Sequence, residues 1–338
     1  MKIFVKLIVV FFPIFLAPGH SETRQEAGII MTVNGPVPVG KMGTSLIHEH
    51  ILVDFIGADS INSNRWNKLK VIEKSLPHLK KIKDLGCQTF VDCTPAFLGR
   101  DPLLLKSLSD SSGLNIITNT GYYGAHNNKF IPGYAFLETA EQLASRWITE
   151  WKEGIEATGI KPGFIKIGVD TGSLSEMHRK LITAAAMTHL KTGLVIASHT
   201  GPAIPAFEQI AILQQEGVSP EAFIWVHAQV EKNQAYHIRA ARSGAWISFD
   251  GINNDNIQVY IQLIKNMKEH NLINKVLLSH DAGWYDPEKV NGGEYRGYSV
   301  LFEKLIPLLL EENFSKAEIN QLLVVNPGRA FEIKIRKI

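Results

Sequence analysis

Two histidines one residue apart, His48 and His50, are the first side chains in this 338-residue sequence whose spacing suggests chemistry. They lie in an apolar segment, residues 44–55, that has the length and composition of a β-strand. Side chains alternate between the two faces of a strand, so both imidazoles point to one face and Glu49 to the other. Two imidazoles on one face suit a divalent metal ion, although a His-x-His pair also arises by chance.

Three later apolar segments place further metal-binding side chains near their carboxyl ends. The segments are residues 194–200, 223–229 and 275–281, and the side chains are His199, His227 and Asp281. The strand period puts His280 on the face opposite to Asp281, so we expect His280 to pack rather than to bind a metal. Packing or solvent-exposed roles are also expected for the histidines of helices and loops, which include His78, His126, His178, His189, His237 and His270.

A lysine interrupts another apolar segment, residues 163–170, where Phe164, Lys166 and Gly168 share one strand face. Burying an ammonium group is costly, because the charge loses its hydration. A neutral amine held near a cationic centre can instead react with carbon dioxide to form a carbamate, which is a bidentate carboxylate ligand. The alternative is an ion pair between Lys166 and Asp170. Together with the imidazoles, the lysine favours the metal site.

Eight short apolar segments recur along the chain, each followed by a polar turn and a stretch with helical spacing. The eight are residues 44–55, 88–94, 115–122, 163–170, 194–200, 223–229, 245–250 and 275–281. The helical stretches include residues 66–85, 137–158, 175–191 and 205–216. This alternation predicts a parallel sheet, and eight repeats favour a closed barrel over an open one. We therefore predict the α/β class and a (β/α)8 TIM barrel, with its chemistry at the carboxyl ends of the strands.

The composition of the chain and the positions of its Gly and Pro residues indicate how many domains it has and which classes of protein it does not belong to. Residues 30–39 contain Gly35 and two prolines and predict a short hairpin before the first strand, and no Pro- or Ser-rich linker divides residues 28–338, which we read as one domain. Hydrophobic residues make up 45% and charged residues 20%, which excludes a disordered chain. A net charge of +2 without a basic cluster argues against a nucleic-acid partner. Two cysteines, Cys87 and Cys93, are too few for a disulfide framework or a thiolate metal site.

The first 21 residues have the order of a signal peptide. Lys2 and Lys6 precede an apolar stretch, residues 7–16, and small or helix-breaking residues follow at positions 17–19. The stretch is shorter than the roughly 20 residues that a membrane-spanning helix needs, and Pro13 interrupts it. We therefore expect residues 1–21 to be removed and the mature protein to be exported to a periplasm or the medium, without a membrane anchor.

The chain resembles the phosphotriesterase family of the amidohydrolase superfamily, which includes organophosphate hydrolases and lactonases. The resemblance spans residues 43–331 and is carried by the phrases GTSLIHEH, FIKIGVD and VLLSHD. It implies two divalent metal ions, with zinc expected and manganese, cobalt or iron also suited to nitrogen and oxygen ligands. It implies a ligand set in which His48, His50 and Asp281 bind one ion, His199 and His227 bind the other, and a carbamylated Lys166 bridges them together with a hydroxide.

The same resemblance implies a reaction and a substrate class. The expected reaction is hydrolysis of an ester-type bond in a small molecule, which is a phosphotriester, a lactone or a carboxylic ester, with Lys166 and Asp281 as catalytic residues. Asp281 would accept the proton of the hydroxide. Tyr123 matches a pocket tyrosine of the family. Lactonase relatives commonly carry an arginine after the strand-seven aspartate, whereas Asp250 is followed here by Gly251, which places a lactone preference in doubt.

The segment after Asp281 is the remaining candidate for substrate contacts. Trp284 and Tyr285 are expected to wall the pocket, and Gly292 with Gly293 would hinge a lid. An ordinary surface loop is the alternative. Relatives are usually homodimers, so a homodimer is expected.

Two other functions remain open at this point. A deaminase of the same superfamily, with one metal ion, also combines His-x-His with a late aspartate but does not use a carbamate on strand four. A binding protein without catalytic activity could use the same scaffold. Counting the metal ions per chain separates the first alternative from a binuclear ester hydrolase.

Overall fold

The computed structural model describes residues 1–4 and 28–338. The predicted signal peptide, residues 1–21, therefore lies almost entirely outside the described residues, and its removal stays a prediction. Within the described part of the chain, no helix has the length and apolar character needed to cross a membrane.

The barrel strands run parallel to one another and are almost entirely buried. They are β3 (Ser45–Leu52), β4 (Thr89–Asp92), β5 (Asn115–Ile117), β6 (Asn119–Thr120), β7 (Phe164–Gly168), β8 (Ile196–His199), β9 (Phe223–Val226), β10 (Trp246–Asp250) and β11 (Val276–Ser279). Every predicted strand segment contains one of them. The third segment is divided into β5 and β6 at Thr118, so β4 pairs with β5 and β7 pairs with β6.

Contacts between the last strand and the first complete the ring. The backbone N–H of His48 donates to Ser279 Oγ at 3.0 Å, and the N–H of Asp281 donates to the carbonyl oxygen of His48 at 3.0 Å. A short further strand, β12 (Gly283–Tyr285), then pairs with β3. The TIM-barrel prediction is confirmed, and the carboxyl ends of all the strands meet at one end of the barrel.

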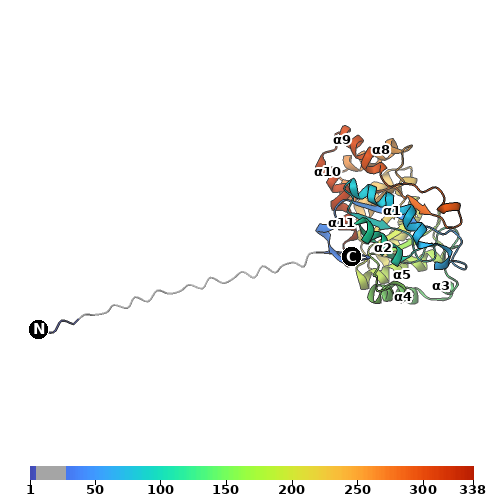
Figure 1. Ribbon diagram of the computed structural model, residues 1–338, viewed down its shortest axis with the longest axis horizontal. Coiled ribbons are helices and arrows are strands. Elements are labelled where there is room, and N and C mark those ends of the chain that lie inside the picture. Colours follow the sequence, from blue (N-terminus) through green and yellow to red (C-terminus); the bar gives the residue numbers. More distant parts are fainter. Residues whose placement is uncertain (5–27) are drawn as a thin grey trace.

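The helices surround the strands (Figure 1). They are α1 (Lys68–Asp84), α2 (Pro102–Ser112), α3 (Gly133–Leu137), α4 (Ala140–Glu153), α5 (Glu176–Thr192), α6 (Ala203–Gln215), α7 (Ala235–Ser243), α8 (Ile257–Glu269), α9 (Ile306–Glu311), α10 (Lys316–Asn320) and α11 (Asn326–Phe331). Local sequence fixes where several begin. Thr139 and Ser175 form capping boxes that start α4 and α5, and glycines in the left-handed region end α2 and α5.

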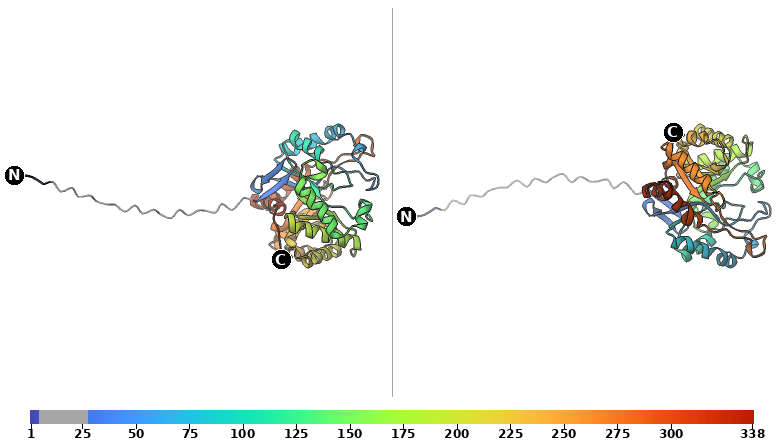
Figure 2. Two further views of the ribbon diagram at one scale, coloured as in Figure 1. Left: turned by 90° about the horizontal axis from the view of Figure 1, so that it is seen from below. Right: turned by 90° about the horizontal axis from the view of Figure 1, so that it is seen from above.

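The amino end of the barrel is filled with apolar side chains. The predicted hairpin is present as β1 (Ile29–Thr32) and β2 (Gly35–Pro38), which pair antiparallel and lie beside α11 (Figure 2). Ile30 and Phe331 pack there against strand residues such as Phe164. Cys87 and Cys93 are buried free thiols, so no disulfide joins them. In the described part of the chain, this packing fills the amino end of the barrel.

Candidate metal and active site

The predicted ligands gather in one cavity at the carboxyl end of the barrel. It has a volume of about 110 Å3. We call these predicted ligand side chains the floor of the cavity; they are His48 and His50 from β3, Lys166 from β7, His199 from β8, His227 after β9, and Asp281 after β11. The structure thus brings together residues that lie up to 233 positions apart in the sequence.

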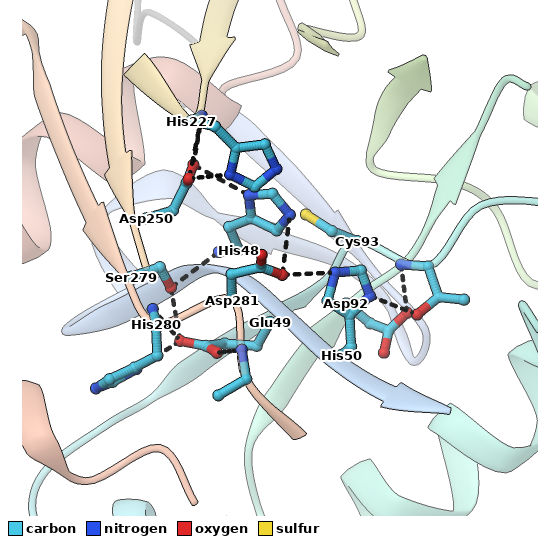
Figure 3. A network of polar contacts seen from close by, with 12 residues as sticks. His48, Glu49, His50, Asp92, Cys93, His227, Asp250, Ser279, His280 and Asp281 are labelled. Carbon is cyan, nitrogen blue, oxygen red and sulfur yellow. Dashed lines mark hydrogen bonds and ion pairs between the residues drawn. The ribbon is translucent and has the colours of Figure 1, made fainter. Parts of the chain in front are cut away.

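His48, His50 and Asp281 form the tighter part of the floor (Figure 3). Asp281 Oδ1 lies 3.1 Å from His50 Nε2 and 3.8 Å from His48 Nε2. The ligand atoms of the three side chains all lie within 4.8 Å of one another. Two imidazole nitrogens and a carboxylate oxygen are a donor set that divalent zinc accepts, so this group fits one metal ion.

The remaining floor residues lie directly beside this group. The rings of His199 and His227 are 4.4 Å apart between centroids, and those of His48 and His227 are 5.0 Å apart. Lys166 is 2% exposed, and its Nζ lies 3.5 Å from His48 Nε2. Of the ion pairs among the described residues, none includes Lys166. Asp170, the alternative partner, instead accepts the backbone N–H of Asn127 at 3.1 Å.

Asp250 is a fully buried carboxylate that orients two floor histidines at once. It accepts hydrogen bonds from His48 Nδ1 at 3.1 Å and from His227 Nδ1 at 2.5 Å, and also from the backbone N–H of His227 and from Ser248 Oγ. Asp250 also falls within metal-binding distance of His48 and His227. Because it already binds the Nδ1 side of both rings, it leaves their Nε2 atoms free for a metal and acts as their support.

Glu49 is a second buried carboxylate, and it supports the turn that carries Asp281. Its side chain points away from the cavity, as the strand period predicts, and is fully buried. It accepts hydrogen bonds from Ser279 Oγ, from the backbone N–H groups of His280 and Ala282, and from His280 Nδ1, all between 2.7 and 3.0 Å (Figure 3). These bonds hold the turn in which Asp281 adopts a left-handed φ of 51°. His280 does not line the cavity and is buried, in agreement with the expected packing role.

The electrostatic surroundings prepare the floor for cations. Burial, together with the charge of Lys166, lowers the pKa of His48 to about 4. Burial also lowers the pKa of His199 well below its ordinary value. Both imidazoles are therefore neutral at pH 7, and each has a ring nitrogen whose lone pair can bind a metal ion. Although burial opposes it, the hydrogen bond to His50 and the nearby imidazoles lower the pKa of Asp281, which is therefore ionised. At His227, burial lowers the pKa, but the charge of Asp250 and its hydrogen bond raise it by more, so the pKa of His227 is raised.

The residues expected to contact the substrate divide into two groups. Tyr123 and Trp284 line the cavity above the floor, next to Val53, Phe55 and Leu98. Tyr285 does not line this cavity, because its side chain is buried in the main hydrophobic core. Successive side chains of β12 point to opposite sides of the strand. Because Trp284 points to the cavity, Tyr285 points into the core. Gly292 and Gly293 adopt left-handed φ angles of 76° and 73° beside a groove that reaches Trp284.

His126 is a cavity residue that sequence reasoning missed. We expected it to be a packing or solvated histidine, but it lines the cavity. Its ring is stacked on Tyr123, with 6.2 Å between centroids, and lies 6.5 Å from the ring of His199. We call Tyr123, His126 and Trp284 the rim. The available signal was that His126 follows the third strand segment, at the end of the barrel where chemistry is expected.

The ring of parallel strands and the imidazole and carboxylate groups at its carboxyl end define a barrel protein with a candidate site for divalent metal ions. A model of the phosphotriesterase family matches residues 28–331, and the chain belongs to that family. It is 28% identical to a phosphotriesterase homology protein of Escherichia coli (strain K12) over 294 residues, which cover 86% of this chain and 98% of the relative. The resemblance expected from the sequence is confirmed.

Two further relatives have names that state an activity. An aryldialkylphosphatase of Saccharolobus solfataricus is 27% identical over 305 residues, covering 86% of this chain and 95% of the relative. A phospho-furanose lactonase of Mycoplasmopsis synoviae is 27% identical over 331 residues, covering 90% of this chain and 92% of the relative.

Proposed function

We propose that this protein hydrolyses an ester-type bond of a small molecule with two divalent metal ions held by the floor, and that Lys166 is carbamylated. The observation that carries the proposal is Lys166 itself, a buried lysine without an ion-pair partner among the described residues and 3.5 Å from a ligand histidine. An unpaired buried ammonium beside cations is unfavourable. A carbamate forms when the ammonium loses one proton and the resulting amine nitrogen bonds to the carbon of carbon dioxide and loses a second. This reverses the charge and supplies two ligand oxygens.

The floor residues divide the work. His48, His50 and Asp281 would hold one ion, His199 and His227 the other, and Lys166 would contact both. Bound divalent cations lower the pKa of a coordinated water and polarise the substrate oxygen, and zinc, manganese, cobalt and iron all suit these ligands. Asp281 is ionised, and its side chain is 23% exposed, so it can accept a proton from the attacking water and release it to solvent.

The cavity walls support a small, largely apolar substrate. Val53, Phe55, Leu98 and Trp284 surround the floor, and the space between them is about 110 Å3. The relatives named aryldialkylphosphatase and phospho-furanose lactonase support a phosphotriester or a lactone, and a carboxylic ester presents the same reacting groups. We therefore propose an ester hydrolase, and within that class these three kinds of bond remain the candidates.

Metal counting and hydrolysis on the same preparation test this function. We expect two ions per chain and cleavage of at least one member of a panel of phosphotriesters, lactones and carboxylic esters. One ion per chain with no ester cleavage would favour the deaminase. Two ions with no cleavage of any panel member would favour a binding protein.

The bridging role of Lys166 has its own test. We expect Lys166→Ala to lose most hydrolysis and to recover part of it with added acetate or propionate, because a short carboxylate can fill the vacated place. The exposed Lys152→Ala is the matched control, and a 13C carbamate signal in the intact protein is an independent measurement. An unchanged rate in Lys166→Ala would exclude the carbamate role, and full metal occupancy in His199→Asn would exclude the ligand set.

Two further proposals concern the whole chain. We propose that residues 1–21 direct export and are removed, which N-terminal sequencing of secreted protein tests, because a chain that still begins at Met1 contradicts it. We also propose a homodimer, which light scattering of the mature protein tests directly.

A further inference from the structure

His126 differs from the histidines of the floor in its exposure to solvent. It is solvent-exposed and still lines the cavity, whereas the floor imidazoles are buried or nearly so. Its ring stacks on Tyr123 and lies beside His199, whereas Trp284, on the other side of the cavity, lies beside His50. A substrate whose reacting atom lies over the floor would therefore have His126 on one side and Trp284 on the other.

The loop that carries His126 is built to hold it there. Three consecutive residues, His126, Asn127 and Asn128, have left-handed φ angles of 58°, 56° and 61°. Histidine and asparagine tolerate this region better than most residues, so the local sequence suits the conformation. Asp170 accepts the backbone N–H of Asn127, and the N–H of Gly124 donates to the carbonyl oxygen of Gly168 at 3.0 Å. Both bonds tie the loop to the end of β7, the strand that carries Lys166.

Gly124 is required for this attachment. A Cβ atom at position 124 would lie 2.8 Å from the carbonyl oxygen of Gly168 and 2.8 Å from Leu181 Cδ1, so a larger residue would push the loop away from β7. The position of His126 is thus set by contacts of the backbone with the barrel.

The His126 ring is also free to act. No hydrogen bond among the described residues uses either of its ring nitrogens, whereas His48, His50 and His227 each have Nδ1 engaged. Two other donors near the cavity are less suited to this role. Trp284 Nε1 has no partner among the described residues but is fully buried, and Arg296 is occupied by the carbonyl oxygen of Asp281.

We infer that His126 is a catalytic residue whose ring N–H donates a hydrogen bond to the leaving-group oxygen of the ester. The inference rests on the proposed function. In the reaction, the oxygen of water bonds to the acyl carbon or the phosphorus, and the bond to the leaving oxygen breaks with its electron pair moving onto that oxygen. Asp281 accepts the proton of the water. The leaving oxygen, stabilised by the N–H of His126, takes a proton from solvent and departs as an alcohol or phenol.

A leaving-group series tests this role in the metal-loaded full-length protein. The probes are aryl and alkyl acetates and the matching diethyl phosphates, ordered by the pKa of the leaving alcohol, and the measurement is kcat/KM. For His126→Ala we expect a loss of about 100-fold with the poorest leaving groups, the size found when one donor to a developing oxyanion is removed. With 4-nitrophenol as leaving group, which needs little stabilisation, we expect a change of less than about 3-fold.

Two variants separate hydrogen bonding from structure. His126→Asn keeps an N–H donor and a residue type that accepts the left-handed backbone, so it should recover part of the loss with poor leaving groups. His270→Ala removes an exposed histidine far from the cavity and should match the wild type. The metal content of His126→Ala should also equal that of the wild type.

The outcomes are distinguishable. A loss in His126→Ala that is uniform across the series, or no loss, overturns the role of His126 while leaving the proposed function intact. Reduced metal content in His126→Ala would make His126 a ligand and also overturn the inference. A wild type that holds two ions and cleaves no member of the series contradicts the proposed function, and the inference falls with it.

Discussion

The floor and the rim of the cavity are built in different ways. Floor residues lie on strands or immediately after them, and fully buried carboxylates fix their orientation, as Asp250 does for His48 and His227. Of the rim residues, His126 lies on a loop and Trp284 on the short strand β12, and both are at least partly exposed, whereas Tyr123 is buried. The difference teaches that the barrel fixes the chemistry, while loops that can change independently fix what is bound.

The floor also behaves as one unit, which the rim does not. Asp250 supports one histidine of each predicted metal group, so a change at this single carboxylate reaches both groups. Rim residues share no such support, because His126 is held through β7 and Trp284 through β12. Substitutions in the floor should therefore have coupled effects, and those in the rim separate ones.

The largest effect is expected for Asp250→Asn. An amide oxygen can accept the N–H of one histidine, but its NH2 group then faces the other histidine and cannot accept, so one ring loses its orientation. We expect the affinity for metal to fall about 10- to 100-fold, with a comparable loss of activity. Metal content after competition with a chelator measures the effect, and Asp255→Asn, at an exposed position, is the control. If one ion stays bound at full affinity, the two groups are independent.

A smaller effect, mainly on stability, is expected for Glu49→Gln. The carboxylate accepts four hydrogen bonds, and the amide would present a donor to at least one of these N–H or O–H groups. We expect the free energy of unfolding to fall by about 1–3 kcal/mol, because a buried donor loses its partner. Urea denaturation of the metal-free protein measures it, and Glu73→Gln on the surface of α1 is the control. Unchanged stability would show that Ser279 and Ala282 find other acceptors.

The same contrast explains what the sequence could predict. All eight strand segments and the floor residues follow from the alternation of side chains and from the rule that chemistry lies at the carboxyl ends of barrel strands. The supporting roles of Glu49 and Asp250 could not be predicted, because they depend on contacts such as that between Glu49 and Ser279, 230 residues apart. The cavity position of His126 was missed because a loop has no side-chain periodicity from which to predict it. The core position of Tyr285 was missed because an unexpected strand, β12, begins only two residues earlier.

A rim substitution should change binding with little effect on the floor. Trp284 packs edge-on to Phe55 and His50 and lines the cavity, so Trp284→Ala removes apolar wall area. We expect KM to rise about tenfold, equivalent to about 1.4 kcal/mol of lost contact, with metal content unchanged. Steady-state kinetics on the best panel substrate measure it. A fall in kcat together with a loss of metal would place Trp284 in the support of the floor, and the boundary between the two regions would have to be redrawn.

The smallest effect is expected one residue further along, for Tyr285→Phe. Tyr285 is 6% exposed, pairs with Leu52 through β12 and packs in the main core, and none of the hydrogen bonds among the described residues uses its hydroxyl group. Removing that hydroxyl should leave kcat and KM unchanged and alter the free energy of unfolding by less than about 0.5 kcal/mol. The comparison with Trp284→Ala uses neighbouring positions on one short strand, so a change in KM for Tyr285→Phe would mean that the substrate reaches behind β12 and that the cavity is deeper than its walls indicate.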